Sequence, residues 1–299
     1  MNVNKHIRTK IKQALNEDIG KGDITTNALI PPNAQAKAVI IAKQSGVIAG
    51  LDIARAVFSQ VDKKVKFKAL VKDGDKVTAG KKIAEITGKA RPILTAERTA
   101  LNFLGHLSGI ATLTREFVNK ARPYKAKILD TRKTVPGMRM LEKYAVRCGG
   151  GINHRMGLWD EVLIKENHIA AISYQLSAIS RKRITLEKII RDIRKKMSKD
   201  VQIEIEVRSL NKLKDVIKGR PDIILLDNMN IHQIRKAVRI RDLFLTAYSL
   251  QLTAILLEVS GRVNLTNVRQ FAKAGVDRIS IGALTHSAKP LDLSLQVWW

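Results

Sequence analysis

The stretch VQIEIEV (201–207), followed after an amphipathic segment by DIILLDN (222–228), decides the fold predicted for this 299-residue chain. Both are apolar runs of strand length, and the apolar residues between them have helical spacing. The same alternation recurs at AKILDT (126–131), EVLIKEN (161–167), AILLEVS (254–260) and VDRISIGAL (276–284). It is typical of repeated βα units and a parallel sheet. One further strand is expected in the glycine-rich segment 148–152, so the count of about seven predicts an α/β barrel or a nearly closed barrel.

The first hundred residues have a different pattern, a helix followed by short strands. The strands are expected in GVIAG (46–50), KKVKFKALV (63–71), KDGDKV (72–77) and TAGKKIAEITG (78–88). Asp-Gly and Ala-Gly between alternating apolar residues predict hairpins. The pattern resembles the sandwich that carries lipoyl or biotinyl groups, but no lysine here has the Met-Lys-Met or Asp-Lys-Ala setting of such carriers. A structural β-rich domain is therefore predicted, and residues 93–118 are expected to form a long helix or helix pair between the two domains.

The charge of the chain is strongly positive, with 54 Lys and Arg against 27 Asp and Glu, or +27. This favours anionic partners such as nucleic acid, phosphorylated metabolites or acidic membrane. The alternative is a solvated basic surface, because the charges run along the whole chain and only 4% of residues are aromatic. The basic stretch at 181–199 is interpreted in this way, as a solvated helix face open to adventitious polyanion binding.

The cysteine count and the apolar runs bear on where the protein works. A single cysteine, Cys148, cannot form an internal disulfide, which favours a reducing compartment and a cytoplasmic enzyme. The N-terminus has no apolar stretch resembling a signal peptide. The longest uncharged run, 243–257, is interrupted by Thr, Ser and Gln, so no membrane span is predicted.

Polar residues lie where each predicted strand ends. They are Asp130 to Lys133, Lys165, Glu206, Asp227, Glu258 and Gly282 to His286. Any one of them could simply mark the point where a strand leaves the core. Because barrels build their active sites from the loops at this end of the strands, the set as a whole predicts a catalytic rim.

Two carboxylates of this rim are candidates for a metal site. In VQIEIEV the period of two places Glu204 and Glu206 on one face of the strand. The next strand ends in Asp227, so neighbouring parallel strands would bring Glu206 and Asp227 together. Such a pair suits a Mg²⁺ that keeps several waters and holds phosphate oxygens. The alternative is that both residues form salt bridges with nearby lysines.

Two glycine turns follow the last strands. Ser260 and Gly261 come after one strand, with Asn264 or Thr266 as the expected N-cap of the next helix, and ISIGALTHS (279–287) supplies the second turn. Free backbone N–H groups at such turns bind anions, and late-strand loops are where barrels commonly hold phosphate. Each turn alone is ordinary; the consecutive pair indicates a phosphate site.

A cationic cluster begins in DTRKTVPGMR (130–139). Its members are Arg132, Lys133, Arg139, Arg155 and Lys165, together with His154 and His168. This exceeds what one phosphate requires, and arginine forks grip planar carboxylates, so a second, carboxylate-rich ligand is implied. Arg139 has the alternative of a helix-terminal charge, and His168 that of a structural hydrogen bond. No His or Cys spacing matches a zinc site.

Taken together, these motifs resemble the quinolinate phosphoribosyltransferase family, whose members are the decarboxylating enzymes of de novo NAD synthesis. The motifs are EDIGKGDITT (17–26), TAERTALNFL (95–104), the stretch 130–168, IEIEV (203–207), ILLDNM (224–229), LLEVSGRVNL (256–265) and ISIGALTHSA (279–288). The resemblance implies an N-terminal α/β sandwich domain, 1–112 completed by 287–299, and a seven-stranded open α/β barrel, 113–286. It also implies a homodimer with shared active sites, quinolinate and phosphoribosyl pyrophosphate as substrates, and Mg²⁺ without pyridoxal phosphate.

The resemblance assigns roles to individual residues. The catalytic set is Glu206, Asp227, Lys133 and Lys165, with Glu206 and Asp227 also at the metal. The quinolinate pocket comprises Arg132, Lys133, His154, Arg155 and Lys165, with Arg98 from the neighbouring subunit. The phosphate site comprises Ser260, Gly261, Arg262, Gly282 and His286. Arg262 departs from the small or amide residue usual in the family, which leaves its contact with phosphate open.

Three alternatives remain open from the sequence. The first is a Schiff-base barrel enzyme that uses Lys133 or Lys165 as nucleophile. The second is the paralogue associated with molybdate transport, acting on another ligand. The third is a nucleic-acid-binding protein on an enzyme fold, suggested by the charge; a specific nucleic-acid partner is not expected, because both the carboxylate pair and the phosphate turns are present.

Overall fold

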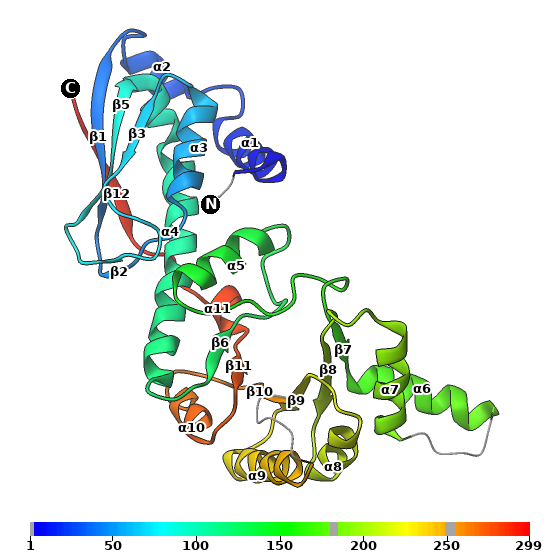
Figure 1. Cartoon of the computed structure of the whole chain (residues 1–299). Coiled ribbons are helices and arrows are strands. Elements are labelled where there is room, and N and C mark those ends of the chain that lie inside the picture. The colour runs from blue at the N-terminus through cyan, green and yellow to red at the C-terminus, as the bar shows by residue number, and fades with distance from the viewer. Residues whose placement is uncertain (1–2, 180–184, 249–254) are drawn as a thin grey trace. The chain divides into compact units, whose positions relative to one another are not determined.

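The computed structural model describes residues 3–179, 185–248 and 255–299, and these form two compact units (Figure 1). The first unit comprises Met1–Arg115, Val135–Gly151 and Leu284–Trp299. The second comprises Glu116–Thr134 and Ile152–Ala283. Relative to the division expected from the sequence, the segment Val135–Gly151 belongs to the first unit instead of the barrel.

The first unit is built on an antiparallel sheet with strand order β12-β1-β5-β3. Its strands are β1 (Gln35–Ala42), β3 (Lys66–Ala69), β5 (Lys82–Lys89) and β12 (Leu293–Trp298). Alternate residues of β1, including Ala36, Ala38 and Ile40, are buried, so one face of the sheet packs on the core. The C-terminal strand β12 pairs with β1 along its whole length, and the end of the chain thus completes this sheet.

Helices cover this sheet and continue the unit. They are α1 (Lys5–Ile19), α2 (Ile24–Leu29), α3 (Leu51–Val61), most of α4 (Ala90–Ala121), α5 (Arg139–Cys148) and the end of α11 (Ala283–His286). The segment 93–118 is part of one continuous helix, α4. Gly105 and Gly109 of α4 allow the C-terminal segment to approach, since a Cβ atom at Gly109 would lie 2.1 Å from the Lys289 carbonyl oxygen.

The hairpins expected at Asp-Gly and Ala-Gly do not form. Strand β4 (Lys76–Val77), which lies between β3 and β5 in the chain, pairs with β2 (Gly46–Val47) in a separate two-stranded ribbon, so neither turn joins strands of the same sheet. The reason is local: Asp73 Oδ1 accepts hydrogen bonds from the backbone N of Gly50 (3.0 Å) and of Leu51 (3.1 Å). Its carboxylate therefore caps the start of α3 and does not form the hairpin turn expected for an Asp-Gly pair.

The second unit contains a parallel sheet with order β6-β11-β10-β9-β8-β7. Its strands are β6 (Lys127–Leu129), β7 (Val162–Ile164), β8 (Ile203–Val207), β9 (Ile223–Asp227), β10 (Leu256–Ser260) and β11 (Arg278–Ser280). These are the six strands predicted from their apolar runs. The seventh, expected near 148–152, is reduced to one parallel bridge between Ile152 and Leu129 at the edge of β6. The sheet has the architecture of an open α/β barrel.

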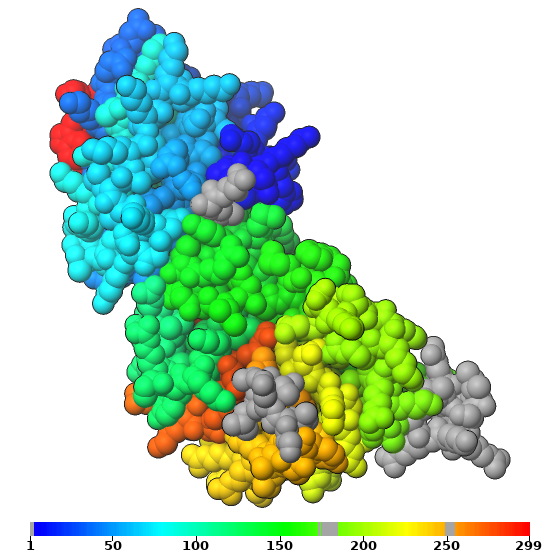
Figure 2. All heavy atoms as spheres, viewed as in Figure 1, coloured from blue at the N-terminus to red at the C-terminus, as the bar shows by residue number. Residues whose placement is uncertain are grey.

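The helices of the second unit follow its strands. They are α6 (Glu166–Ile179), α7 (Leu186–Lys196), α8 (Leu210–Lys218), α9 (Ile231–Ala247) and α10 (Val268–Lys273). Side-chain caps fix several starts, with Thr185 before α7, Ser209 before α8 and an Asn230–Gln233 capping box before α9. In Figure 2, α8 and α9, yellow to orange, form the surface at the lower end of this unit.

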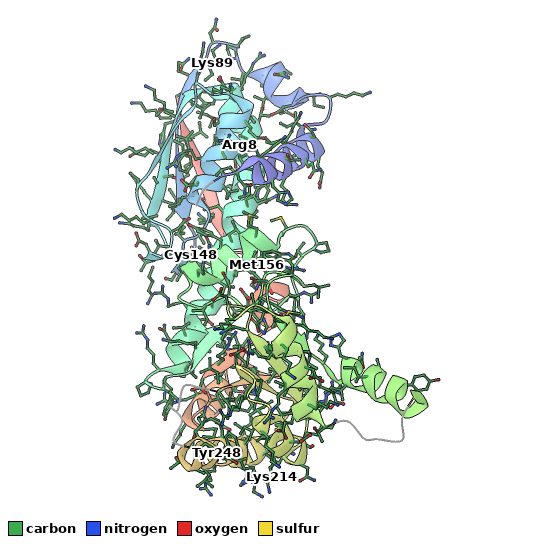
Figure 3. The ribbon with its side chains drawn as sticks, turned by 45° about the vertical axis from the view of Figure 1, so that its right-hand side comes forward. Arg8, Lys89, Cys148, Met156, Lys214 and Tyr248 are labelled. Carbon is green, nitrogen blue, oxygen red and sulfur yellow. The ribbon has the colours of Figure 1, made fainter. Side chains whose placement is uncertain are left out.

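The basic residues are spread over both units. Figure 3 labels Arg8 and Lys89 in the first unit and Lys214 in the second, among many nitrogen-tipped side chains. Of the basic stretch 181–199, residues 181–184 lie outside the described residues. The rest is mainly α7, which buries Leu186, Ile189 and Ile190. Its Lys188, Arg191, Lys195 and Lys196 are exposed, whereas Arg194 is half-buried and pairs with Asp222. Across the described ranges, none of the helices has both the length and the apolar character that crossing a membrane requires.

Candidate active site

The carboxyl ends of the strands in the second unit surround a pocket of about 430 Å³. Its lining residues are Thr131, Arg132, Lys133, His154, Arg155, Leu163, Lys165, Glu206, Arg208, Leu225, Asp227, Ser260 and Ser280. Of the predicted residues, the pocket therefore brings together four of the five Lys and Arg residues of the cationic cluster, His154, both carboxylates and the first residue of the predicted phosphate turn. Its position at the ends of parallel strands is where barrels place their active sites.

The cationic side of the pocket comes from three segments. Arg132 and Lys133 follow β6, Arg155 follows the bridge at Ile152, and Lys165 follows β7. The Arg155 guanidinium is almost fully buried, and its Nη1 donates to the Glu161 carbonyl oxygen at 3.0 Å. Burial and then the charge of Arg132 lower the pKa of Arg155. A cluster of like charges around one buried arginine is complementary to a ligand with more than one negative charge.

The acidic side consists of Glu206 on β8 and Asp227 on β9, which are neighbouring parallel strands. Arg208 joins them: its Nη2 lies 3.1 Å from Glu206 Oε1 and its Nε lies 3.1 Å from Asp227 Oδ2. The two carboxylates lie on neighbouring strands, as predicted. The alternative expected salt bridges with lysines, and the ion-pair partner is instead Arg208. Burial and then the Asp227 charge raise the pKa of Glu206, while Arg208 and Lys165 oppose the shift.

The turn after β10 approaches the turn after β9 closely. Gly261 has φ +89°, and a Cβ atom there would lie 2.3 Å from Asn228 Oδ1. Asn228 also has a left-handed backbone, and its Nδ2 donates to Asp227 Oδ2 at 3.0 Å. A glycine is therefore required at 261, because any side chain would push the carboxylate-bearing turn aside.

The remaining residues of the phosphate turns are less close to the pocket. Gly261, Arg262 and Gly282 directly follow β10 and β11 without lining it, and Arg262 is exposed. The expected N-cap is wrong: α10 is preceded by Asn267, which makes no side-chain cap bond. The Asn264 side chain instead accepts hydrogen bonds from the backbone N of Thr266 and Asn267. It forms an Asx turn immediately before the helix.

A buried charged layer lies beneath the pocket. His154 Nε2 is 3.1 Å from Glu204 Oε2 and 3.4 Å from Glu258 Oε1, and Arg278 Nε is 2.7 Å from Glu258 Oε2. Both carboxylates are fully buried. These ion pairs are close in distance, although the carboxylate oxygens accept no well-aligned hydrogen bond from the residues that the structure describes. Buried charges of this kind require mutual compensation.

The protonation of this layer follows from its contacts. Burial would lower the pKa of His154, but its contacts with Glu204 and Glu258 raise it. His154 Nδ1 accepts a hydrogen bond from Arg155 N (2.8 Å), so that nitrogen has no proton, and the ring proton is on Nε2, which faces the two carboxylates. Burial and then Glu258 raise the pKa of Glu204, whereas for Glu258 the contacts with His154 and Arg278 outweigh burial and lower the pKa.

Asp130 fixes the backbone that carries His154. Its Oδ1 accepts a hydrogen bond from His154 N at 3.0 Å, and its other oxygen accepts from Asn153 Nδ2. Asp130 is fully buried at the end of β6. The first residue of the DTRK motif is thus a positioning residue, while the following cations line the pocket.

Three predicted or considered residues belong to the first unit. Arg98 is an exposed residue of α4 and lines a pocket of about 370 Å³ with Pro290 and Leu291. His286, at the end of α11, is exposed and its Nδ1 lies 2.6 Å from Ser287 Oγ. Arg139 begins α5. His168, in the second unit, makes the structural hydrogen bond considered for it, because its Nδ1 accepts from Lys165 N at 3.0 Å.

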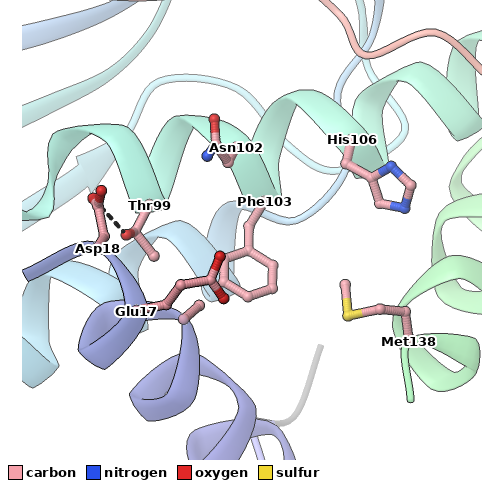
Figure 4. A pocket seen from close by; sticks show the side chains of 8 residues that line it. Glu17, Asp18, Thr99, Asn102, Phe103, His106 and Met138 are labelled. Carbon is pink, nitrogen blue, oxygen red and sulfur yellow. Dashed lines mark hydrogen bonds between the residues drawn. The ribbon is translucent and has the colours of Figure 1, made fainter. Parts of the chain in front are cut away.

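Another pocket, of about 380 Å³, lies within the first unit (Figure 4). Glu17 and Asp18 come from α1, Asn102 and His106 from α4, and Met138 from the segment before α5. No member of the cationic cluster lines it. Its two carboxylates would repel anionic ligands such as quinolinate and phosphoribosyl pyrophosphate. The pocket of the second unit therefore remains the candidate active site.

Potential metal ligands occur in two arrangements. His154, Glu161 and Glu204 have ligand atoms within 4.8 Å of one another, the one such group of three among residues 3–179, 185–248 and 255–299. In that group His154 already compensates Glu204, which leaves little need for a metal. Glu206 and Asp227 fit Mg²⁺ better, because both carboxylates line the open pocket, where the ion could keep several of its waters.

Sequence reasoning missed Arg208, Arg278 and Ser280. The signal for Ser280 and Arg278 was present, since a period of two places them on the same face of their strand. Arg208 is the first residue after β8, two residues beyond Glu206. Its role depends on a side-chain direction that the sequence does not contain.

Comparison with known proteins identifies both parts of the chain. Residues 23–108 match the family described as quinolinate phosphoribosyl transferase, N-terminal domain, and residues 110–296 match the corresponding C-terminal domain. The nicotinate-nucleotide pyrophosphorylase [carboxylating] of Mycobacterium leprae is 41% identical over 293 residues, 97% of this chain and 96% of that protein. The probable enzyme of the same name from Methanocaldococcus jannaschii is 42% identical over 96% of this chain and 95% of its own. The crystal structure of NadC from Streptococcus pyogenes is similar with a TM-score of 0.88 and 38% identity, covering 100% of this chain and 98% of that one.

Proposed function

The chain belongs to the quinolinate phosphoribosyltransferase family, and we propose that the pocket of its second unit is where this activity takes place. The protein is a pentosyltransferase of NAD biosynthesis: it transfers phosphoribose from phosphoribosyl pyrophosphate to quinolinate and releases CO₂, giving nicotinate mononucleotide and pyrophosphate. The observation that carries the location is that five cationic side chains and two carboxylates line one pocket. The alternative of a molybdate-associated paralogue has no support among these relatives.

Quinolinate carries two adjacent carboxylates on a pyridine ring. Arg132, Lys133 and Arg155, with Lys165 and the His154 ring, are proposed to hold these carboxylates and to orient the ring nitrogen toward the ribose. The arginine forks provide bidentate contacts that a single charge would not. The near-complete burial of Arg155 supports this role, because a partly desolvated guanidinium binds an anion more strongly.

The carboxylate pair is proposed to act on phosphoribosyl pyrophosphate. Glu206 and Asp227 would hold Mg²⁺, which when bound neutralises pyrophosphate charge and helps it leave. The same two side chains stabilise positive charge developing at the ribose, and Lys133 and Lys165 stabilise the departing anion. Ser260, Gly261, Arg262 and Gly282, followed by His286, are proposed at the 5′-phosphate.

Decarboxylation follows from the same arrangement. Once the pyridine nitrogen is alkylated, its positive charge stabilises the electron pair that CO₂ leaves on the neighbouring ring carbon, and that carbon then takes a proton from water, so no pyridoxal phosphate or Schiff base is required. The cations must therefore anchor the ring without stabilising the ground-state carboxylate too strongly.

Two further proposals concern assembly and location. A homodimer, in which Arg98 of one chain reaches the quinolinate of the other, would give a role to an exposed arginine of α4 that the family motif TAERTALNFL contains. A reducing, cytoplasmic location is supported by the single cysteine, Cys148.

The test is direct. The purified protein is incubated with quinolinate, phosphoribosyl pyrophosphate and Mg²⁺, and nicotinate mononucleotide and CO₂ are measured, with nicotinate in place of quinolinate as the control. We expect product only from quinolinate. Product from nicotinate, or none from a folded protein, would contradict the proposal.

A further inference from the structure

Arg208 holds an unusual position in the pocket. It is the first residue after β8, directly before Ser209, whose side chain caps α8. Its guanidinium forms ion pairs with Glu206 and Asp227 at 3.1 Å each, using two different nitrogens. The two carboxylates are themselves 10% and 15% exposed, whereas the Arg208 side chain is 56% exposed. An exposed cation thus covers two nearly buried anions.

The guanidinium takes up the same carboxylate oxygens that a metal would use. Glu206 Oε1 and Asp227 Oδ2 both face Arg208, and Asp227 Oδ2 also accepts from Asn228 Nδ2. A cation bound to these oxygens and the present position of Arg208 are therefore mutually exclusive. The pair of contacts is exposed and its strength modest, since surface ion pairs contribute about 0.2–1 kcal/mol each.

Resting on the proposed function, we propose that Arg208 is a displaceable counterion of the metal site. In the free enzyme it neutralises Glu206 and Asp227 and competes with a divalent cation that arrives alone. When the cation arrives with the pyrophosphate of the substrate, it takes the two carboxylates. Arg208 then leaves them and pairs with the phosphate oxygens at the same pocket wall. The exchange keeps every charge compensated, and metal and substrate therefore bind with positive coupling.

This coupling predicts that loss of Arg208 changes metal affinity in the opposite direction from loss of a metal-binding carboxylate. Removing the Arg208 charge should tighten binding of a lone divalent cation and weaken the mutual enhancement between cation and phosphoribosyl pyrophosphate. A residue that merely braces the end of β8 would do neither. Arg191 provides the matched control, because it is an exposed arginine of the same unit whose ion pair is with Glu187 on α7.

The experiment titrates Mn²⁺, a paramagnetic substitute for Mg²⁺, into metal-free protein and follows the signal of free Mn²⁺ by electron paramagnetic resonance. The variants are R208Q, R208K, R191Q and D227N, each checked for an unchanged thermal midpoint. Without substrate we expect R208Q to bind Mn²⁺ about tenfold more tightly than wild type, from the loss of two exposed ion pairs. R208K should be intermediate, R191Q should match wild type, and D227N should bind weakly.

The second arm repeats the titration with saturating phosphoribosyl pyrophosphate. Wild type should gain more Mn²⁺ affinity from the substrate than R208Q gains. Equal or weaker Mn²⁺ binding by R208Q in the first arm, or equal gains in the second, would overturn the proposal, as would a lack of Mn²⁺ binding in every variant. The first arm requires no turnover, so a failure to form nicotinate mononucleotide would count against the proposed function and not against the role of Arg208.

Discussion

Arg278 Nε lies 2.7 Å from Glu258 Oε2, and this ion pair is buried beneath the candidate active site. The two residues face each other because β10 and β11 are parallel neighbours with Glu258 and Arg278 in direct register. Glu258 in turn contacts His154, which lines the pocket. The ion pair between β10 and β11 thereby contacts His154, which is proposed to bind quinolinate.

Replacing Arg278 by Met should therefore destabilise the protein markedly. The substitution leaves Glu258 buried with one cation fewer, and breaking a buried pair in this way costs about 3–5 kcal/mol. Urea unfolding of R278M and wild type measures the difference. The double variant R278M/E258Q should recover much of the loss, because the orphaned charge is gone; a single-variant cost below about 1 kcal/mol would contradict the account.

Gly109→Ala separates close packing from helix propensity. Alanine at an open helical position stabilises by about 1 kcal/mol relative to glycine. At Gly109 the added Cβ would meet the Lys289 carbonyl oxygen at 2.1 Å, so we expect destabilisation instead, by more than about 1 kcal/mol. Gly105→Ala is the graded comparison, since its Cβ would lie 2.9 Å from the Leu291 carbonyl oxygen. If G109A melts at a higher temperature than wild type, the close approach of the C-terminal segment is wrong.

Asp23 should stabilise the first unit in a pH-dependent way. Its Oδ1 caps α2 by accepting from Thr26 N at 2.9 Å, and its Oδ2 accepts from Thr95 Oγ1 at 3.1 Å. We expect Asp23→Ala to cost about 1 kcal/mol at pH 7. The hydrogen bonds from Thr26 lower the pKa of Asp23 below its unfolded value.

The sign of the pH effect follows from that direction. A carboxyl with a lowered folded-state pKa contributes stability above its unfolded pKa of about 3.9, and the contribution is lost as the pH falls through the folded-state value. The stability gap between wild type and D23A should thus narrow between pH 6 and pH 2.5. Asp23→Asn retains a capping oxygen without the charge. Its stability should therefore differ less from that of wild type at pH 7 than the stability of D23A does, and it should depend less on pH.

Much of this structure could be predicted from local sequence patterns. The six parallel strands are short apolar runs between helices, and the meeting of Glu206 with Asp227 required only that β8 and β9 be neighbours. What failed depended on three-dimensional competition for a side chain. Asp73 caps α3 instead of closing a hairpin, and the strand expected near Ile152 pairs at a single position because β6 offers only a three-residue edge.

The site was predictable to the same extent. Residues adjacent to strand ends were found, because the end of a strand fixes where a side chain emerges. Arg208 was missed, because a long side chain reaches across two strands in a direction that spacing does not encode. Arg98 and His286 belong to the first unit, and their proposed roles at the pocket depend on relations that neither spacing nor burial determines.

Arg155→Ala should separate binding of the two substrates. Loss of a buried charged donor costs about 1.5–3 kcal/mol, so the KM for quinolinate should rise about tenfold to a hundredfold while that for phosphoribosyl pyrophosphate changes little. Arg155→Lys keeps the charge but loses the fork, and an intermediate KM is expected. Steady-state kinetics with each substrate varied in turn gives both values. An equal rise in the KM for quinolinate and the KM for phosphoribosyl pyrophosphate would contradict the assignment of Arg155 to the quinolinate pocket.

Mixing two variants, R98A and R155A, at a quinolinate concentration where neither alone is active tests whether sites are shared between chains. If Arg98 serves the partner's pocket, R98A has an intact Arg155 and R155A an intact Arg98, so a hybrid dimer contains one complete site. In an equal mixture half of the dimers are hybrids, and activity should return to about a quarter of the wild-type value. The chains are mixed, subjected to mild denaturant to exchange subunits, and assayed for nicotinate mononucleotide, with each variant alone treated identically. Recovery requires complementation in trans, because neither chain can supply both arginines to one site. If exchange is verified by a mass tag and no activity returns, Arg98 acts within its own chain or not at all.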